Sequence, residues 1–219
     1  AFGCYIVEHI VRKRFLDITF LLLLDLSNNK LTILPDNVFT SLGLLQVLDL
    51  SSNPLRANFK ELFHYAQSLK HLNLANSGIT STPHLPLPNL VHLNLSHNQL
   101  FEVPSHLWIH LPKLKSLDLS FNPIKEIVAD SFYGLQNLQD LNIQGLKYLD
   151  RFESKGIQQI RILSSLSMQT WPKIEHFAEQ FCNLLSNLQQ LRILKIHFVE
   201  SVLDEQLLCV KNRKIRHLE

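Results

Sequence analysis

The chain has 219 residues, of which 46% are apolar and 18% are charged, and its formal net charge at pH 7 is +2. This composition excludes a disordered or collagen-like chain, because such chains are polar and charged or rich in glycine and proline. The near-zero net charge gives no electrostatic reason to expect nucleic acid as a partner. The longest apolar run, residues 20–24, is too short to cross a bilayer, so we expect membrane contact only through segments outside this chain.

A leucine-based repeat is evident from residue 21 onward. Its first copy contains Leu21, Leu24, Leu26, Asn29 and Leu31, and four further copies follow at intervals of 24, 24, 21 and 24 residues. A sixth copy begins with Leu138, Leu141 and Ile143 at the same spacing. Near-identical copies at a fixed period indicate a solenoid of stacked units, because one unit alone is too small to bury its apolar face.

Each unit contains one short predicted strand, whose leucines point into the core. The asparagine that follows turns the chain, and its buried amide needs backbone partners in adjacent turns. We expect this structural asparagine ladder at Asn29, Asn53, Asn98 and Asn122. The fold class is therefore α/β: a horseshoe-shaped solenoid with a concave parallel β-sheet and an irregular or helical convex side.

A large aromatic residue stands eighteen positions after the start of most units and should fill the convex side of the core. The members of this set are Phe15, Phe39, Phe63, Trp108, Phe132 and Phe181. The 21-residue unit lacks an aromatic residue at this position and contains Pro83, Pro86 and Pro88 instead.

Residues 1–219 are expected to form one uncapped array, with regular repeats at about 21–145 and irregular repeats at about 146–219. Extrapolation places Val7 and Phe15 on apolar positions of an earlier unit, and Ile215 and Leu218 open another unit. The array therefore reads as a fragment of a longer protein, because neither end has the polar or disulfide-bonded cap of a solenoid.

The irregular part departs from the asparagine pattern, because the ladder position holds Leu146, Trp171 and Val199. Apolar spacing predicts a convex helix over 173–190, and a shorter helix over 58–69. Two interpretations of the irregular part remain open. It is either a set of relaxed repeats near the end of an array, which we favour, or a specialised surface.

The three cysteines, Cys4, Cys182 and Cys209, have no metal-ligand spacing. The favoured interpretation is that they are buried thiols that pack as small apolar residues. The alternative is a disulfide between Cys182 and Cys209, because these two residues fall at nearly equivalent places in successive repeats.

Segments such as LLLLDLSNNKLTILPDNVFTSLGLL and LKSLDLSFNPIKEIVADSFYGLQNL resemble leucine-rich-repeat proteins of the 24-residue subclass that is common in animal secreted and cell-surface proteins. The resemblance covers residues 2–218, strongly from 21 to 145. The sequence pattern is similar to that of the ectodomains of chaoptin-like adhesion proteins and Toll-like receptors. The resemblance implies the solenoid fold and a role in binding, and it leaves the partner open.

Residues between the strand leucines should face the concave side. One column holds only aspartate and asparagine: Asp25, Asp49, Asn73, Asn94, Asp118 and Asn142. Neighbouring strands lie about 5 Å apart, so these side chains should form a polar ladder. The ladder could accept hydrogen bonds from a ligand, but the favoured interpretation is structural, because these residue types belong to the ordinary motif of the subclass.

In a second concave column His71 and His92 should be adjacent, with His97 nearby. A polar contact patch is favoured over a zinc or pH-sensing site, because no three-ligand set follows from the repeat geometry. Phe121 is either a binding anchor or packed on the adjacent loop. The candidate ligand-binding face comprises His71, Asn73, His92, Asn94, His97, Lys115, Asp118 and Phe121.

No enzyme signature, cofactor motif or metal site is expected from this sequence. Asn94 begins a glycosylation acceptor, Asn94-Leu95-Ser96, that also arises from the repeat consensus. The first functional hypothesis is a recognition module of a cell-surface or secreted adhesion or receptor protein that binds a protein ligand through the concave sheet and its edges. The oligomeric state is open, and a homodimer is one alternative. The alternatives are a cytoplasmic leucine-rich-repeat scaffold or inhibitor, and the repeat region of an enzyme whose catalytic domain lies elsewhere.

Overall fold

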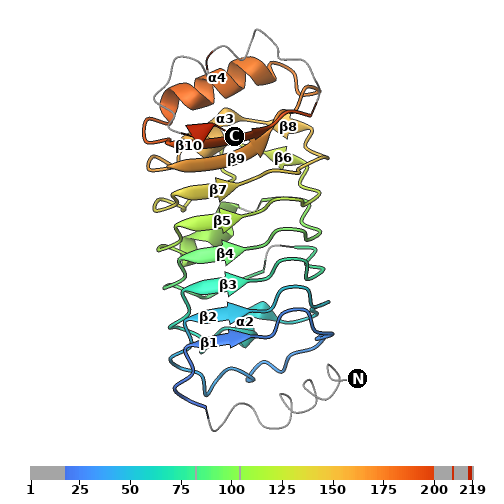
Figure 1. Ribbon diagram of the computed structural model, residues 1–219, viewed down its shortest axis with the longest axis vertical. Helices are drawn as coiled ribbons and strands as arrows, with labels where there is room; N and C mark the ends of the chain where they lie inside the picture. The colour runs from blue at the N-terminus through green and yellow to red at the C-terminus, as the bar shows by residue number, and fades with distance from the viewer. Residues whose placement is uncertain (1–17, 82, 104, 200–208, 210–216, 219) are drawn as a thin grey trace.

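The computed structural model describes residues 18–81, 83–103, 105–199, 209 and 217–218. Within these residues the main feature is one parallel sheet in the strand order β1-β2-β3-β4-β5-β7-β9-β10-β11 (Figure 1). Its strands are β1 (Leu23–Asp25), β2 (Val47–Asp49), β3 (His71–Asn73), β4 (His92–Asn94), β5 (Ser116–Asp118), β7 (Asp140–Asn142), β9 (Ser165–Gln169), β10 (Ile193–His197) and β11 (His217–Leu218). The predicted solenoid with a parallel sheet is confirmed.

The register of the sheet follows the leucine repeat. The second residue of every strand in this nine-stranded sheet is a leucine, and these leucines pair with one another across the sheet. Leu218 pairs with Leu194, so the unit extrapolated at the C-terminal end has the expected register. The unit extrapolated before residue 18, including Val7 and Phe15, lies outside the described residues.

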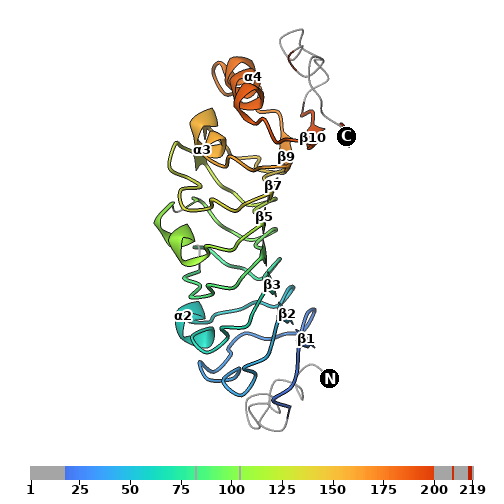
Figure 2. The ribbon, with the colours of Figure 1, turned by 90° about the vertical axis from the view of Figure 1, so that its left-hand side faces the viewer.

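The side opposite the sheet carries short helices, and the sheet lies on the concave side of the curve (Figure 2). The convex elements are α2 (Phe59–Leu62), the 3-10 helix η1 (Ser105–His110), the strand pair β6 (Glu126–Ile127) and β8 (Arg151–Phe152), α3 (Ser154–Gln158) and α4 (Phe177–Asn187). The two helices expected from apolar spacing both exist but are shorter than predicted. The helix α4 starts at Phe177 because His176 before it has a left-handed φ of 55°.

The convex aromatic residues fill the core as predicted. Phe39, Phe63, Trp108, Phe132 and Phe181 are all buried, each with no more than 1% of its surface exposed. The Phe39 and Phe63 rings of adjacent units stack at a centroid distance of 6.3 Å. The aromatic rings are thus buried within the stacked array, and a single unit could not cover its own ring.

The asparagine ladder links successive turns through buried amides. Asn53 Nδ2 donates to the carbonyl oxygens of Leu26 and Leu50, both at 2.9 Å. Its Oδ1 accepts from the N–H of Leu31 at 3.1 Å. Leu26 and Leu31 belong to the preceding unit, so one side chain satisfies backbone groups in two turns. A buried backbone group without a partner costs about 1–3 kcal/mol, so the ladder removes a large penalty.

The hydrogen bonds made at the ladder position differ between units. Asn98 and Asn122 make the same kind of contacts as Asn53 and are buried. Among the described residues, Asn29 donates to the carbonyl oxygens of Leu26 and Ser27 in its own turn. Ser77 stands at the ladder position of the 21-residue unit, and its N–H donates to Asn98 Oδ1 at 2.9 Å.

A second backbone ladder runs along the turns that follow the strands. The residue at each of these turns has a left-handed φ: Asn28, Ser52, Asn76, His97, Phe121 and Gly145. In the first five turns its N–H donates to a backbone carbonyl of the next unit, as from Asn28 to Ser51 at 2.9 Å. At Gly145 the acceptor is the side-chain Oε1 of Gln169 at 3.0 Å, so the backbone ladder ends there.

The C-terminal units use other contacts in place of the asparagine amide. Leu146 is fully buried at the ladder position, and Trp171 Nε1 in the next unit donates to the Leu146 carbonyl at 2.9 Å. Strands β9 and β10 have five residues instead of three. The units after Gly145 therefore remain in the sheet without the amide ladder.

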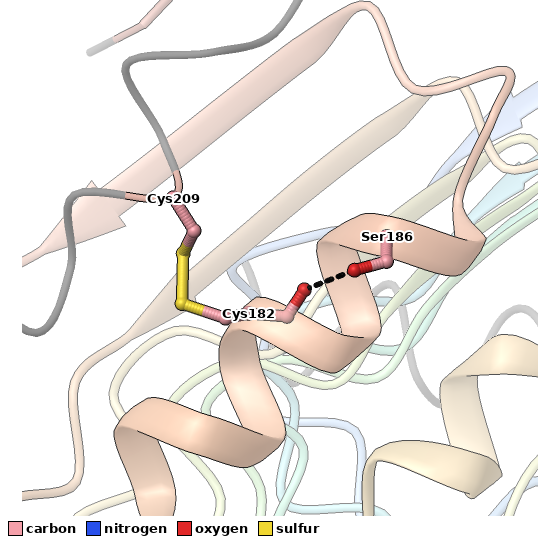
Figure 3. The surroundings of a disulfide bond; sticks show 3 residues. All are labelled: Cys182, Ser186 and Cys209. Atoms are coloured by element: carbon pink, nitrogen blue, oxygen red, sulfur yellow. Dashed lines mark hydrogen bonds between the residues drawn. A yellow bond between two sulfur atoms is a disulfide. The ribbon is translucent and has the colours of Figure 1, made fainter.

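The structure contradicts the favoured interpretation of two cysteines. Cys182 in α4 and Cys209 form a disulfide across a sequence separation of 27 residues, with a Cα–Cα distance of 5.7 Å (Figure 3). They are not two free buried thiols, because their equivalent places in successive repeats bring them within bonding reach. Cys4 lies outside the described residues.

Candidate binding face

The aspartate and asparagine column of the concave sheet supports the backbone. Asp118 Oδ1 accepts from the N–H of Ser120 at 2.9 Å, and equivalent bonds occur at Asp25, Asp49, Asn73, Asn94 and Asn142. These contacts are Asx turns, in which a side-chain oxygen holds the N–H two residues ahead. The column therefore stabilises the turn that leaves each strand.

Two cross-strand pairs extend this support between units. Asn73 Nδ2 donates to Asp49 Oδ2 at 2.8 Å, and Asn142 Nδ2 donates to Asp118 Oδ2 at 2.9 Å. The carboxylates of Asp49 and Asp118 are thus shared between their own turn and the next strand. Of the predicted face, Asn73 and Asp118 therefore support both a turn and a neighbouring strand, and Asn94 supports its own turn.

His71 and His92 form an imidazole pair at the start of β3 and β4. Their rings stack at a centroid distance of 4.3 Å with an interplanar angle of 8°, as their paired register implies. Both side chains are exposed on the concave face, and the exposed Lys115 precedes the next strand. The stacked rings lie face to face, and the described residues contain no group of three metal-ligating side chains.

The pKa of His92 lies below its usual value. The largest cause is partial removal of the ring from water, followed by the positive charge of His71. Asp140 opposes the shift, and Lys115 adds to it. This electrostatic environment favours a neutral His92, which lets the two rings stack without charge repulsion.

His97 and Phe121 form a separate edge stack beyond the carboxyl ends of the strands. Their rings lie 4.4 Å apart with an interplanar angle of 12°. His97 therefore contacts Phe121 and not the imidazole pair, so the predicted face divides into two clusters at opposite ends of the strands. Phe121 is 47% exposed, and its ring also covers Gly145, so it packs on the next loop while one side remains open.

A pocket of about 600 Å³ opens next to the edge stack. We call it the edge pocket, and its lining includes Phe121, Gly145, Lys147, Trp171, Lys173 and His197. Sequence reasoning identified Phe121 and missed the rest of this site. The available signal was the loss of asparagine at Leu146 and Trp171, which marks where the turns change shape.

Asn94 lies in β4 between Asn73 and Asp118 of the neighbouring strands. It is half-buried, and its Oδ1 accepts a hydrogen bond from the Ser96 N–H at 2.9 Å. A glycan at this acceptor would project from the middle of the concave face.

Within the described residues, no helix has the length and apolarity needed to span a membrane.

The repeat geometry and the sequence comparisons define the class of protein. A family model described as "Leucine rich repeat" matches residues 7–55, 88–146 and 112–169, and "Leucine Rich repeats (2 copies)" matches residues 67–105. The chain therefore belongs to the leucine-rich-repeat family, whose solenoids are typically non-enzymatic modules for protein interaction.

Among particular proteins, the chain is similar to Tsukushi from two vertebrates. It is 31% identical over 192 residues to Tsukushi of Gallus gallus, covering 85% of this chain and 51% of the relative. It is also 31% identical over 194 residues to Tsukushi of Mus musculus, covering 85% of this chain and 54% of the relative. The chain thus spans about half the length of these relatives.

Solved structures share the solenoid fold. TLR13 in its complex with ssRNA13 superposes with a TM-score of 0.73 at 25% identity, covering 93% of this chain and 29% of TLR13. Internalin C2 from Listeria monocytogenes gives a TM-score of 0.66 at 19% identity, covering 90% of this chain and 80% of internalin C2. The second likeness shows the fold alone.

Proposed function

We propose that this protein recognises a protein partner at the cell surface or outside the cell, as part of an adhesion or receptor-type protein. The observation that carries the proposal is the exposed imidazole pair and its charged neighbours on the concave sheet. The fold is held by buried amides and Asx turns, so these exposed side chains are available for contact with a partner.

The disulfide supports an extracellular location. Disulfides persist in secreted and cell-surface proteins and are rare in the reducing cytosol. The Cys182–Cys209 bond therefore favours this proposal over a cytoplasmic scaffold or inhibitor. The third hypothesis, a repeat region attached to an enzyme, would place the chemistry in another domain and leave recognition to this chain.

The proposed contact surface combines the imidazole pair with Lys115 and Asp140. These groups offer hydrogen-bond donors and both signs of charge on adjacent strands. Polar groups of this kind contribute orientation and specificity, while an aromatic residue such as Phe121 contributes apolar contact area. A protein surface with mixed polar and apolar character would fit this face.

The test is a screen of the multimerised protein against a library of secreted and cell-surface proteins, followed by affinity measurements on variants. We expect His92→Ala and Lys115→Ala each to weaken binding of the partner by about tenfold, the ratio that corresponds to 1.4 kcal/mol. Tyr133→Ala is the matched control, because Tyr133 is 61% exposed and lies outside the sheet.

Loss of affinity in the Tyr133 variant together with normal affinity in both concave variants would overturn the proposed binding face. Circular dichroism of each variant would confirm that the fold is retained.

A further inference from the structure

The edge pocket has an apolar floor and a basic rim. Phe121, Leu149 and Trp171 supply apolar surface, and Lys147, Lys173 and His197 stand among the other lining residues. The described residues that line the pocket include no aspartate or glutamate. Its volume of about 600 Å³ falls within the range of about 300–1,000 Å³ that is usual for ligand sites.

The break between the two kinds of repeat creates this pocket. Phe121 has a φ of 55°, which is unusual and strained for a bulky side chain. Its ring occupies the space that a side chain at position 145 would need, because a Cβ on Gly145 would come within 2.3 Å of it.

The walls of the pocket are fixed by hydrogen bonds made elsewhere. Trp171 is 4% exposed, and its indole N–H is held by the Leu146 carbonyl. The side chain of Gln169, at the end of β9, is held by the N–H of Gly145. Because the Trp171 indole and the Gln169 side chain already have hydrogen-bond partners, a ligand can contact the apolar floor without breaking either hydrogen bond.

We propose that the edge pocket accepts an apolar side chain from an acidic segment of the protein partner, with the carboxylates of that segment paired to Lys147 and Lys173. Charge complementarity carries this assignment, since the rim offers cations and the floor offers apolar contact. The pocket adjoins the edge stack at the carboxyl ends of the strands, where a protein that crosses the concave face would reach it. The inference rests on the proposed function of protein recognition.

The probe is a synthetic peptide, Asp-Glu-Leu-Phe-Asp-Glu, titrated into the ¹⁵N-labelled protein at neutral pH. The chain has two tryptophans, so two indole N–H signals report on binding. Trp171 lines the pocket, whereas Trp108 is 1% exposed in the convex core and serves as the internal control. We expect a saturable shift of the Trp171 signal and an unchanged Trp108 signal.

Two comparison peptides separate the charge from the apolar contact. Lys-Lys-Leu-Phe-Lys-Lys and Asp-Glu-Ala-Ala-Asp-Glu should each bind at least tenfold more weakly than the probe. Lys147→Glu and Lys173→Glu should also weaken the probe at least tenfold, whereas Lys30→Glu should not. Lys30 is an exposed lysine in the first regular unit and makes a matched control.

The proposal is overturned if the acidic peptide leaves Trp171 unchanged, or if the charge-reversed peptide binds equally well. A shift of Trp171 by dodecanoate but not by the peptide would also overturn it and would assign the pocket to a lipid anion. The His92 and Lys115 variants distinguish this failure from failure of the proposed function, because these residues do not line the pocket.

Discussion

The regular units before Gly145 and the units after it use different contacts to hold successive turns together. In the regular part, buried asparagine amides tie successive turns together through backbone contacts, as at Asn53 and Asn98. In the later part, Leu146 is apolar at that position, and the indole of Trp171 and the side chain of Gln169 bond to the preceding unit. A disulfide adds a covalent link at α4.

This difference shows that the leucine register and the turn chemistry are separable. The strand leucines stay in register from β1 to β11, although the asparagine ladder stops. The sheet therefore propagates by apolar packing and backbone pairing, and the turns are free to change shape. That freedom permits the longer strands and the edge pocket of the later part.

Removal of a ladder amide should have the largest effect on stability. Asn98 makes five hydrogen bonds through its side chain, three as donor and two as acceptor. Asn98→Ala leaves buried backbone groups unpaired, so we expect the free energy of unfolding to fall by about 3–4 kcal/mol. Chemical denaturation of the purified variant measures this loss.

Asn29→Ala is the control for the ladder, because Asn29 is half-buried and, within the described residues, bonds inside its own turn. Its loss should cost about 1 kcal/mol, since water can replace the amide. Equal losses at Asn29 and Asn98 would contradict the proposed contribution of contacts between units.

Loss of the disulfide should have the next largest effect, and it should be local. Replacement of Cys182 and Cys209 by serine opens a link across 27 residues, for which chain-entropy arguments give about 3 kcal/mol. Hydrogen exchange should show faster opening of α4 and unchanged protection of β2 to β5. Faster exchange spread evenly over all units would show that the array unfolds as one body.

The contact between Phe121 and Gly145 gives a smaller and coupled effect. Gly145→Ala introduces a Cβ that clashes with the Phe121 ring at a residue whose φ is 69°. We expect a loss of about 2 kcal/mol, of which about half is backbone strain. In a Phe121→Ala background the same change should cost about 1 kcal/mol, because the clash is absent. An unchanged cost in that background would argue against contact between the two residues.

The pH dependence at His92 should be the smallest effect. The unfolded pKa is 6.5 and the folded pKa is lower, so below pH 6.5 the unfolded chain binds more protons than the folded chain. The contribution of His92 is therefore present above pH 6.5 and is lost as the pH falls through 6.5 toward the folded pKa. The stability difference between pH 7.5 and 5.5 should be smaller in His92→Gln than in the unmodified protein. An identical difference in both proteins would remove His92 as the cause.

The fold could be predicted because it depends on local periodicity. Leucine spacing defines the strands and their register, and the buried position of Asn53 follows from the need of an amide for partners. The stacking of His71 on His92 follows from the same register.

The rest of the candidate site depends on contacts that periodicity does not encode. The stack of His97 on Phe121 and the ring over Gly145 depend on the left-handed φ of these turn residues. The leucine spacing does not show which turn residues have this conformation. The disulfide depends on the orientation of α4, so spacing alone left it as an alternative. The edge pocket lies where the asparagine of the repeat is lost, at Leu146 and Trp171. The repeat pattern therefore could not predict the local structure there.

Recognition outside the cell is the central claim, and the most direct test is antibody labelling of the tagged full-length protein on intact cells and in the medium. Alkylation under non-reducing conditions and glycosidase treatment of the same material would report on Cys182–Cys209 and on Asn94. The account predicts signal on unpermeabilised cells or in the medium, with Cys182 and Cys209 protected from alkylation. Signal only after permeabilisation, with both cysteines alkylated without reduction, would contradict it.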